Sequence, residues 1–219
     1  MGQKVHPYAF RLGPLYTWKS RWFADKKQYA QLVKQDDQIR NLLMTQLRPA
    51  GITDIEIERS LKKITIRLYV TRPGVVIGRG GSGIQLLKQQ LDQIINQDQP
   101  DNKRIQLELN VEEVKVPELS AYFMATRIAD QLAHRLPHQR VVKRAMEQII
   151  NAGAQGVKVV LSGRIGGKEI SRTENFSLGS VPRQTIRSQI DYAQVPAYTK
   201  SGFIGVKVWI HLPEQTSEN

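Results

Sequence analysis

A cluster of glycines in the first half of the chain is the sharpest chemical signal in the sequence. Half of residues 74–83 are glycine, and Arg79 lies among them. Glycine lets a backbone approach a ligand closely, and a neighbouring cation would attract phosphate. Residues 78–83 fit the G-x-G-x-x-G pattern of dinucleotide sites, with Asp98 and Asp101 near the expected acidic position. A glycine-rich turn without a ligand and an RNA-binding loop are the two other interpretations.

The sequence before the glycines argues against a dinucleotide site. That fingerprint follows a buried parallel strand, which is a continuous apolar run. Here only Val75 to Ile77 lie between Pro73–Gly74 and the glycines, and the strand further upstream alternates between apolar and polar residues. We therefore favour the GXXG loop of a KH domain, in which glycines admit the RNA backbone and a helix N-terminus offers N–H groups to phosphate. The loop residues are Gly78, Arg79, Gly80 and Gly81.

The elements around this loop occur in the order that a type II KH domain requires. Apolar residues recur at helical spacing between 29 and 47, and Pro49 and Gly51 end that helix. Two alternating segments near 54–58 and 63–70 predict strands with one buried face. A second helix and a third strand follow the glycines. We expect a KH domain over residues 25–112, with helices on one face of a three-stranded sheet.

A second α/β domain is expected after a hinge at residues 113–118, so the fold class is α/β (α+β). Pro117 is expected to begin a helix, Pro137 to interrupt the pattern, and a further helix to run from about His138 to Gly153. Short alternating strands follow, with Ile170 in one of them. We predict two helices on a mostly antiparallel sheet over residues 119–212, and a short tail at 213–219.

The first 24 residues are expected to form an extended arm. Basic residues alternate there with Tyr, Trp, Gly and Pro, and no helical or strand period holds. A mobile tail is the alternative, but aromatic rings beside cations indicate docking on a partner. Lys4 and Arg11 are the RNA-contact candidates in this arm.

The charge of the chain points to a polyanionic partner. Lys and Arg number 32 against 20 Asp and Glu, which gives a net charge of +12 and a pI of about 10. No uncharged apolar run approaches the roughly 18 residues of a membrane span. Because the cations are spread through strands, loops and helices rather than opposite one apolar face, nucleic acid is favoured and no membrane partner is expected.

Two basic clusters in the second domain are further candidates. Arg140, Lys143 and Arg144 are spaced by three and four residues, so they share one helix face with no acid among them. A merely solvated face is the alternative. Interspersed cations and glycines in the later loops favour phosphate contacts. Those cations are Arg164, Lys168, Arg172, Arg183 and Arg187.

Enzyme chemistry finds no support in the sequence. There is no cysteine, which removes disulfides and thiol chemistry and suits a reducing compartment. His134 and His138 are four apart, but Pro137 breaks the helix that a zinc site would need, and both are expected to be surface residues. The glycine cluster lacks the Lys-Ser/Thr ending of a P-loop. We expect no catalytic or metal-binding residues, no cofactor and no small-molecule substrate.

With these motifs in place, the chain strongly resembles the family of ribosomal protein three of the small subunit, in its bacterial or organellar form. The resemblance extends from Met1 to about Leu212. Four separated blocks carry it in the right order: 1–7 with 11–13, 75–81, 162–167 with 172–174, and 190–192 with 205–210. Tyr8 departs from the family, which often has Asn there.

The resemblance implies a place in the head of the small subunit, bound to rRNA and touching ribosomal proteins ten and fourteen. It also implies that, with proteins four and five nearby, the chain lines the mRNA entry channel. The family's basic channel residues fall on Lys143 and Arg144, whereas a third, usually basic, falls on Glu147. The ribosome would be cytoplasmic, plastid or mitochondrial. A stand-alone KH regulator or assembly factor is the alternative function.

Overall fold

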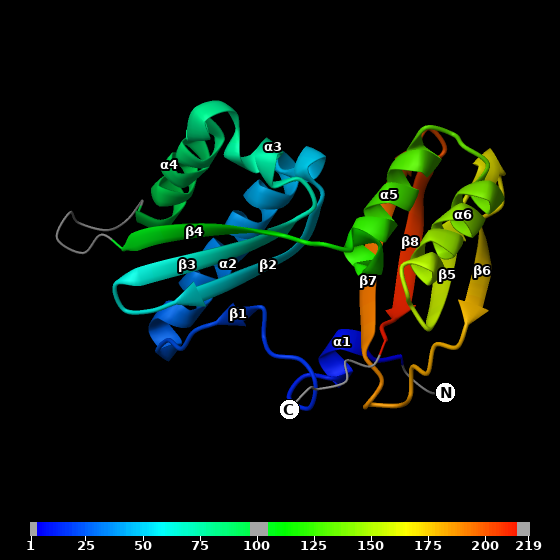
Figure 1. Cartoon of the computed structure of the whole chain (residues 1–219), viewed down its shortest axis with the longest axis horizontal. Helices are drawn as coiled ribbons and strands as arrows, with labels where there is room; N and C mark the ends of the chain where they lie inside the picture. Colours follow the sequence, from blue (N-terminus) through cyan, green and yellow to red (C-terminus); the bar gives the residue numbers. More distant parts are fainter. Residues whose placement is uncertain (1–3, 97–104, 214–219) are drawn as a thin grey trace. The chain divides into compact units, whose positions relative to one another are not determined.

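The computed structural model describes residues 4–96 and 105–213 (Figure 1). The chain forms two compact units. The KH unit is Trp18–Lys115, and the C-terminal unit combines the segment up to Thr17 with the chain from Val116 onward. Asp98, Asp101 and most of the predicted tail lie outside the described residues.

The KH unit places its helices on one face of a four-stranded sheet (Figure 1). The sheet order is β1-β2-β3-β4, with β2 antiparallel to β3 and β3 parallel to β4. The strands are β1 (Ser20–Arg21), β2 (Ile52–Arg59), β3 (Lys63–Val70) and β4 (Gln106–Glu113). The helices are α2 (Lys26–Gln46), α3 (Pro73–Ile77) and α4 (Ser82–Asn96), with 3-10 turns at Arg48–Ala50 and Arg79–Gly81.

Alternation in the strands builds the core of this unit. Ile55, Ile57 and Ile66 are fully buried, while the residues between them face away from the helices. Ile39 of α2 and Leu91 of α4 are fully buried against the same face. Full burial of each such side chain contributes about 1.5–3 kcal/mol. The predicted type II KH fold is confirmed, with β1 added at the edge of the expected three strands.

The β1 strand divides the arm that we expected to be one extended segment. Arg40 holds β1 beside β2, because its guanidinium donates to the Ile55 carbonyl at 2.8 Å and to Ser20 Oγ at 2.8 Å. Residues further upstream belong to the C-terminal unit, where Pro7–Phe10 form the short helix α1. The first 24 residues therefore differ from a single extended arm: they form part of both units.

The C-terminal unit has two helices on one face of an antiparallel sheet of order β6-β5-β8-β7 (Figure 1). This matches the predicted second domain. The helices are α5 (Ala121–Ala133) and α6 (His138–Asn151). The strands are β5 (Gly156–Gly163), β6 (Arg172–Gly179), β7 (Ile190–Thr199) and β8 (Gly202–His211).

Two local expectations for this unit are wrong. Pro117 begins a 3-10 turn that ends at Leu119, and α5 begins only at Ala121, because Ser120 caps it by accepting from the Phe123 N–H. Ile170 lies in no strand and is 83% exposed. A single apolar residue does not indicate a strand, and the residues around Ile170 do not alternate between apolar and polar.

No helix in the described part of the chain is long and apolar enough to cross a membrane. Among the described residues, no group of three acidic, His or Cys side chains could hold a metal ion.

Candidate nucleic-acid interfaces

The glycine loop has the geometry that close approach to a phosphate backbone requires. It connects α3 to the N-terminus of α4, and Gly78, Gly80 and Gly81 all have positive φ angles. A Cβ at Gly83 would lie 2.5 Å from the Val76 carbonyl oxygen, so glycine there permits α3 and α4 to pack closely. At Gly80 a Cβ would meet nothing within 4 Å, so the tip of the loop is open.

Charge and apolar surface both surround this loop. Arg79 is exposed, and no ion pair joins it to a carboxylate of a described residue. Val75 and Ile77 of α3 are 51% and 40% exposed. The Ser82 N–H at the start of α4 donates to the Arg79 carbonyl, and the N–H groups that follow in the first turn lie at the positive end of the helix dipole, which favours an anion. The loop can hold phosphate at its tip and unstacked bases beside it.

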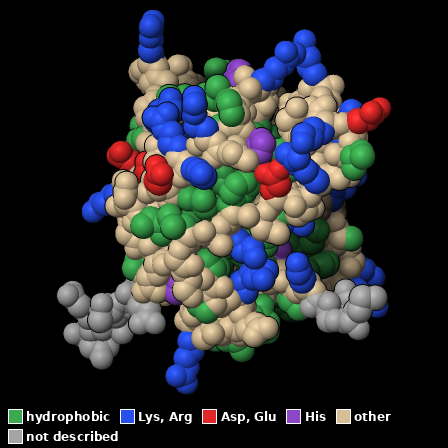
Figure 2. Space-filling view, turned by 90° about the vertical axis from the view of Figure 1, so that its right-hand side faces the viewer, with side chains coloured by type: hydrophobic (Ala, Val, Ile, Leu, Met, Phe, Trp, Pro, Cys, Tyr) green, Lys and Arg blue, Asp and Glu red, His purple; other side chains and the backbone are tan. Residues whose placement is uncertain are grey.

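The second candidate is the solvent-facing side of α6, which we call the α6 face. Val142, Met146 and Ile149 are buried, as the spacing predicted. The opposite side exposes Arg140, Lys143 and Arg144, and none of these three pairs with a carboxylate in residues 4–96 or 105–213. Glu147 is also exposed, one turn after Lys143. Figure 2 shows that Lys and Arg outnumber acidic side chains on the surface that it presents.

At the start of α6, one carboxylate holds two basic residues. Glu174 of β6 contacts His138 Nε2 at 3.0 Å and Arg172 Nη2 at 2.7 Å. His138 is therefore partly buried in a contact, not the plain surface residue that we expected. Arg172 already has a carboxylate partner, which weakens its candidacy as an RNA contact.

The remaining basic candidates differ in what their side chains contact. Arg164 donates to the Lys168 carbonyl at 2.9 Å and to the Ser201 carbonyl at 3.4 Å, so it organises its loop while Lys168 stays exposed. Arg183 lies over the ring of Trp209, 5.8 Å from the centroid. Lys4 is exposed.

Arg11 cannot contact RNA in this structure, which corrects our expectation. Its side chain is fully buried, and its Nε donates to the Ser188 carbonyl at 2.7 Å and its Nη2 to the Thr185 carbonyl at 2.8 Å. Further carbonyls accept from the same group: those of Pro7, Pro182 and Arg183. Burial lowers the pKa of Arg11, although a guanidinium stays charged near neutral pH. Arg11 therefore ties residues 182–188, a loop without regular structure, to the N-terminal segment.

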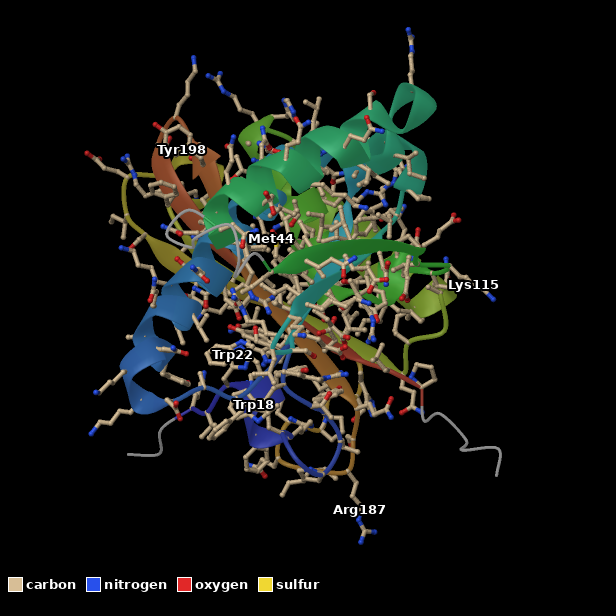
Figure 3. The ribbon with its side chains drawn as sticks, turned by 90° about the vertical axis from the view of Figure 1, so that its left-hand side faces the viewer. Trp18, Trp22, Met44, Lys115, Arg187 and Tyr198 are labelled. Atoms are coloured by element: carbon tan, nitrogen blue, oxygen red, sulfur yellow. The ribbon has the colours of Figure 1, made fainter. Side chains whose placement is uncertain are left out.

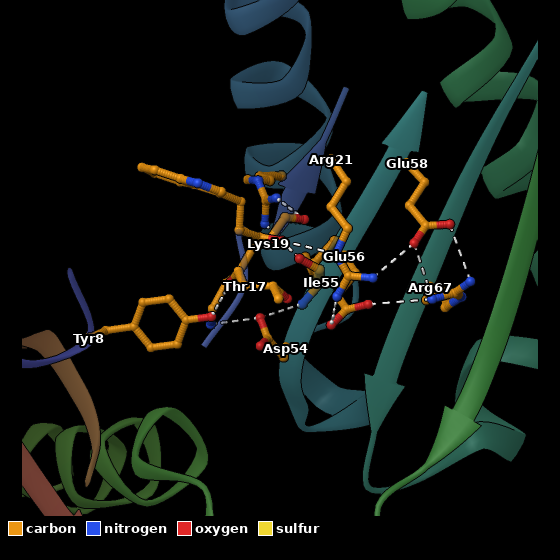
Figure 4. Close-up of polar contacts among 11 residues, drawn as sticks. Tyr8, Thr17, Lys19, Arg21, Asp54, Ile55, Glu56, Glu58 and Arg67 are labelled. Carbon is orange, nitrogen blue, oxygen red and sulfur yellow. Dashed lines mark hydrogen bonds and ion pairs between the residues drawn. The ribbon is translucent and has the colours of Figure 1, made fainter. Parts of the chain in front are cut away.

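In the KH unit, the sheet face opposite the helices is rich in ion pairs (Figure 4). Arg67 contacts Glu58 at 3.2 Å and Glu56 at 3.6 Å, and Arg21 contacts Glu58 at 3.0 Å. Lys19 and Lys63 are paired in the same way, with Asp54 at 2.8 Å and with Glu108 at 2.7 Å. The Lys63 ammonium is the main reason that the pKa of Glu108 is lowered. These cations are already neutralised, so this face is a poor site for RNA.

Two cations that sequence reasoning did not single out lie on the open sheet face of the C-terminal unit. Lys158 of β5 and Lys207 of β8 alternate with the buried valines of their strands. That alternation could have revealed them, because a strand with one buried face must present the residues between on the other.

Comparison with known proteins agrees with both units. Residues 38–119 match the family model of the KH domain, and residues 128–210 match that of the ribosomal protein S3 C-terminal domain. The chain is 45% identical over its whole length to the small ribosomal subunit protein uS3 of Persephonella marina, covering 93% of that protein.

Two other relatives carry the same name. The uS3 protein of Carboxydothermus hydrogenoformans is 42% identical over the whole chain, which covers 97% of that relative. The uS3 protein of Clostridium botulinum is 42% identical over 98% of the chain, with 93% of the relative covered. The order of KH unit and C-terminal unit, together with this identity along the chain, shows that the chain belongs to the uS3 family of small ribosomal subunit proteins.

Proposed function

We propose that this chain, as a structural ribosomal protein of the small subunit, binds rRNA in the subunit head through its KH loop and its C-terminal basic surfaces. Family membership makes it a non-enzymatic ribosomal component, as the sequence had indicated. The observation that carries the RNA contacts is the set of exposed cations without carboxylate partners among the described residues, with Arg79 at the open glycine loop. Phosphate can replace water at such cations without first breaking an ion pair.

The α6 face is proposed to contact mRNA at the entry channel. Arg140, Lys143 and Arg144 extend from a helix whose other side packs in the core, so their backbone positions are fixed. Their charges have no carboxylate partner in residues 4–96 or 105–213. Holding single-stranded mRNA there would favour the open state of an incoming hairpin, because only a difference in affinity between single strand and duplex can shift that equilibrium. Glu147 would weaken the hold.

Neighbouring proteins and location belong to the same proposal. We propose that ribosomal proteins ten and fourteen contact this chain and that proteins four and five lie beside the channel, as the family resemblance implies. The relatives named above are bacterial, which favours a cytoplasmic bacterial ribosome over a plastid or mitochondrial one.

Sedimentation tests this proposal against a stand-alone RNA-binding regulator. The chain should migrate with small ribosomal subunits from its own cells and remain bound through a moderate salt wash, since many phosphate contacts must be broken together. Recovery of the chain only in the soluble fraction, with no small-subunit peak, would contradict a structural role and favour the regulator.

A further inference from the structure

One face of the C-terminal sheet presents no acidic strand residue, and we call it the outer sheet face. One end of it is covered, because His6 packs on Tyr192 with ring centroids 4.9 Å apart, and Trp209 is buried beneath Arg183. The outer sheet face is formed by the strand residues that point away from α5 and α6. Among them are Lys158, Val160, Asn175, Ser177, Tyr192, Gln194, Tyr198, Phe203, Lys207 and Trp209. The two acidic residues of these strands turn the other way: Asp191 accepts from the Ala121 N–H at 2.7 Å, and Glu174 contacts His138 of α6.

The cations of this face have no carboxylate partner among the described residues. Lys158 pairs in register with Trp209, and Lys207 pairs with Val160, so the two lysines are diagonal neighbours about 7–8 Å apart at Cα. Neither they nor Arg183 form an ion pair with any carboxylate in the part of the chain that the structure describes. Partial burial, with Arg183 and Lys4 nearby, lowers the pKa of Lys158. An anion would relieve this repulsion.

Two exposed aromatic rings lie at one end of the same face. Tyr198 and Phe203 are 71% and 66% exposed, and their ring centroids are 5.2 Å apart. They flank the turn between β7 and β8, which is held by a 2.7 Å hydrogen bond from Thr199 Oγ1 to the Gly202 carbonyl. Figure 3 shows Tyr198 near the end of its strand. Lys207 lies four residues from Phe203 on β8, about 13 Å along the strand. Exposed rings and cations along one surface are the recurring platform for unpaired bases.

We propose that the outer sheet face binds unpaired RNA, with phosphates at Lys158 and Lys207 and a base stacked on Tyr198 or Phe203. This inference rests on the proposed function in RNA binding. It adds a third RNA-binding surface and specifies that this surface binds unpaired RNA. Duplex RNA would satisfy the lysines but offers no free base to the rings. A protein partner would need carboxylates facing the lysines, and the test below includes that outcome.

The experiment uses the full chain with the other two surfaces weakened by Arg79→Asp, Gly80→Asp, Lys143→Gln and Arg144→Gln. The probes are a labelled single-stranded oligouridine RNA and an RNA duplex of equal length. Adding Tyr198→Ala with Phe203→Ala should weaken single-strand binding about tenfold, within the range for base stacking, and leave duplex binding unchanged. Both side chains are largely exposed, so their loss should not unfold the unit.

The lysines are tested by salt dependence. Lys158→Gln with Lys207→Gln should reduce the slope of log affinity against log salt by about 1.4, at about 0.7 per phosphate contact on a single strand. The matched control is Lys19→Gln with Lys63→Gln, which removes equal charge from cations that are already paired, and it should change the slope far less.

The inference is overturned if the aromatic pair has no effect, or if the lysine control has an effect equal to that of Lys158→Gln with Lys207→Gln. It is also overturned if subunits carrying Tyr198→Ala lose a neighbouring protein while RNA affinity is unchanged, which would make this face a protein interface. If the weakened chain does not bind oligouridine while the unmodified chain does, this inference alone fails. If the unmodified chain does not bind either, the proposed function fails too.

Discussion

The two units of this protein share one architecture and use its open side in opposite ways. Each packs its long helices on one face of a four-stranded sheet and carries cations on the other face. On the KH sheet, Arg67 lies between Glu56 and Glu58, and its basic neighbours are also paired. On the C-terminal sheet, Lys158 and Lys207 have no carboxylate partner among the described residues.

From this difference we propose that the partners of each cation, rather than the net charge of the chain, locate its RNA surfaces. A cation held by a cross-strand carboxylate has already exchanged water for a counter-charge, so phosphate gains little by displacing it. A cation without such a partner keeps its full attraction for phosphate. By this criterion we propose Arg79, the α6 face and the outer sheet face as RNA surfaces, and we expect little RNA binding at the KH sheet.

The largest effect is expected at Arg11. This buried cation is held by carbonyl groups, so it belongs neither to the cations paired with carboxylates nor to the exposed cations without such partners. Arg11→Met would leave buried carbonyls of residues 182–188 without donors, so we expect the free energy of unfolding of the C-terminal unit to fall by about 3 kcal/mol or more. Urea unfolding measures this. Arg187→Met removes an exposed arginine from the same loop (Figure 3) and should change stability by less than about 0.5 kcal/mol. Equal stability of the two variants would contradict the buried role of Arg11.

The next effect concerns the glycine loop. Arg79→Asp with Gly80→Asp should weaken RNA binding by the full chain about tenfold or more, since carboxylates replace a charge-assisted contact. The fold should survive, because Gly80 has φ 61° and ψ 22°, a conformation that Asp and Asn tolerate.

The neutral control for this loop is Arg79→Gln with Gly80→Asn, which makes the same conformational demand without negative charge. It should weaken binding less than the acidic pair does. A well-folded acidic variant with unchanged affinity would argue against the loop as an RNA site.

A smaller effect is expected at the α6 face. Lys143→Ala with Arg144→Ala should slow elongation through a stable mRNA hairpin by about two- to fivefold, in line with the weak energies of exposed charges. Unstructured mRNA should be translated at the normal rate, and Glu147→Lys should speed passage through the hairpin. Gln139→Ala changes an exposed neutral residue of the same helix and is the control. If every variant matches the unmodified ribosome on both messages, this face is merely solvated.

The smallest effect is expected from a variant that removes carboxylate partners from the cations of the KH sheet. Glu56→Gln with Glu58→Gln removes both carboxylate partners of Arg67, so single-strand RNA affinity should rise by about two- to fivefold and the salt slope should steepen. Glu112→Gln with Glu113→Gln adds the same charge without breaking an ion pair between described residues, and it should have less effect. A larger gain from this second pair would mean that net charge alone governs binding.

Much of the fold could be predicted because it depends on local alternation. The alternation at Ile55 and Ile57 predicts one buried face of β2, and Pro137 indicates the start of α6. The α6 face also followed from spacing alone, since buried and basic residues alternate with the helical period.

The features that could not be predicted depend on contacts distant in sequence. Nothing beside Arg11 indicates that four of its five carbonyl acceptors lie more than 170 residues away, in the loop around Thr185. The pairing of Arg67 with Glu58 depends on the register between β2 and β3, which the sequence alone does not give. The strand β1 has too few residues to show an alternation of apolar and polar side chains. Lys158 and Lys207 look like ordinary surface residues until the register shows that no acid shares their face.

Site-directed crosslinking tests the central claim most directly, because the chain contains no cysteine. Val160→Cys places a single thiol in the middle of the outer sheet face, and Thr65→Cys places one on the open face of the KH sheet. Each would carry the same short photocrosslinker in assembled small subunits. We predict strong RNA crosslinks from position 160 and few from position 65. Equal yields, or more RNA crosslinking from position 65, would contradict the claim that cations without carboxylate partners mark the RNA surfaces.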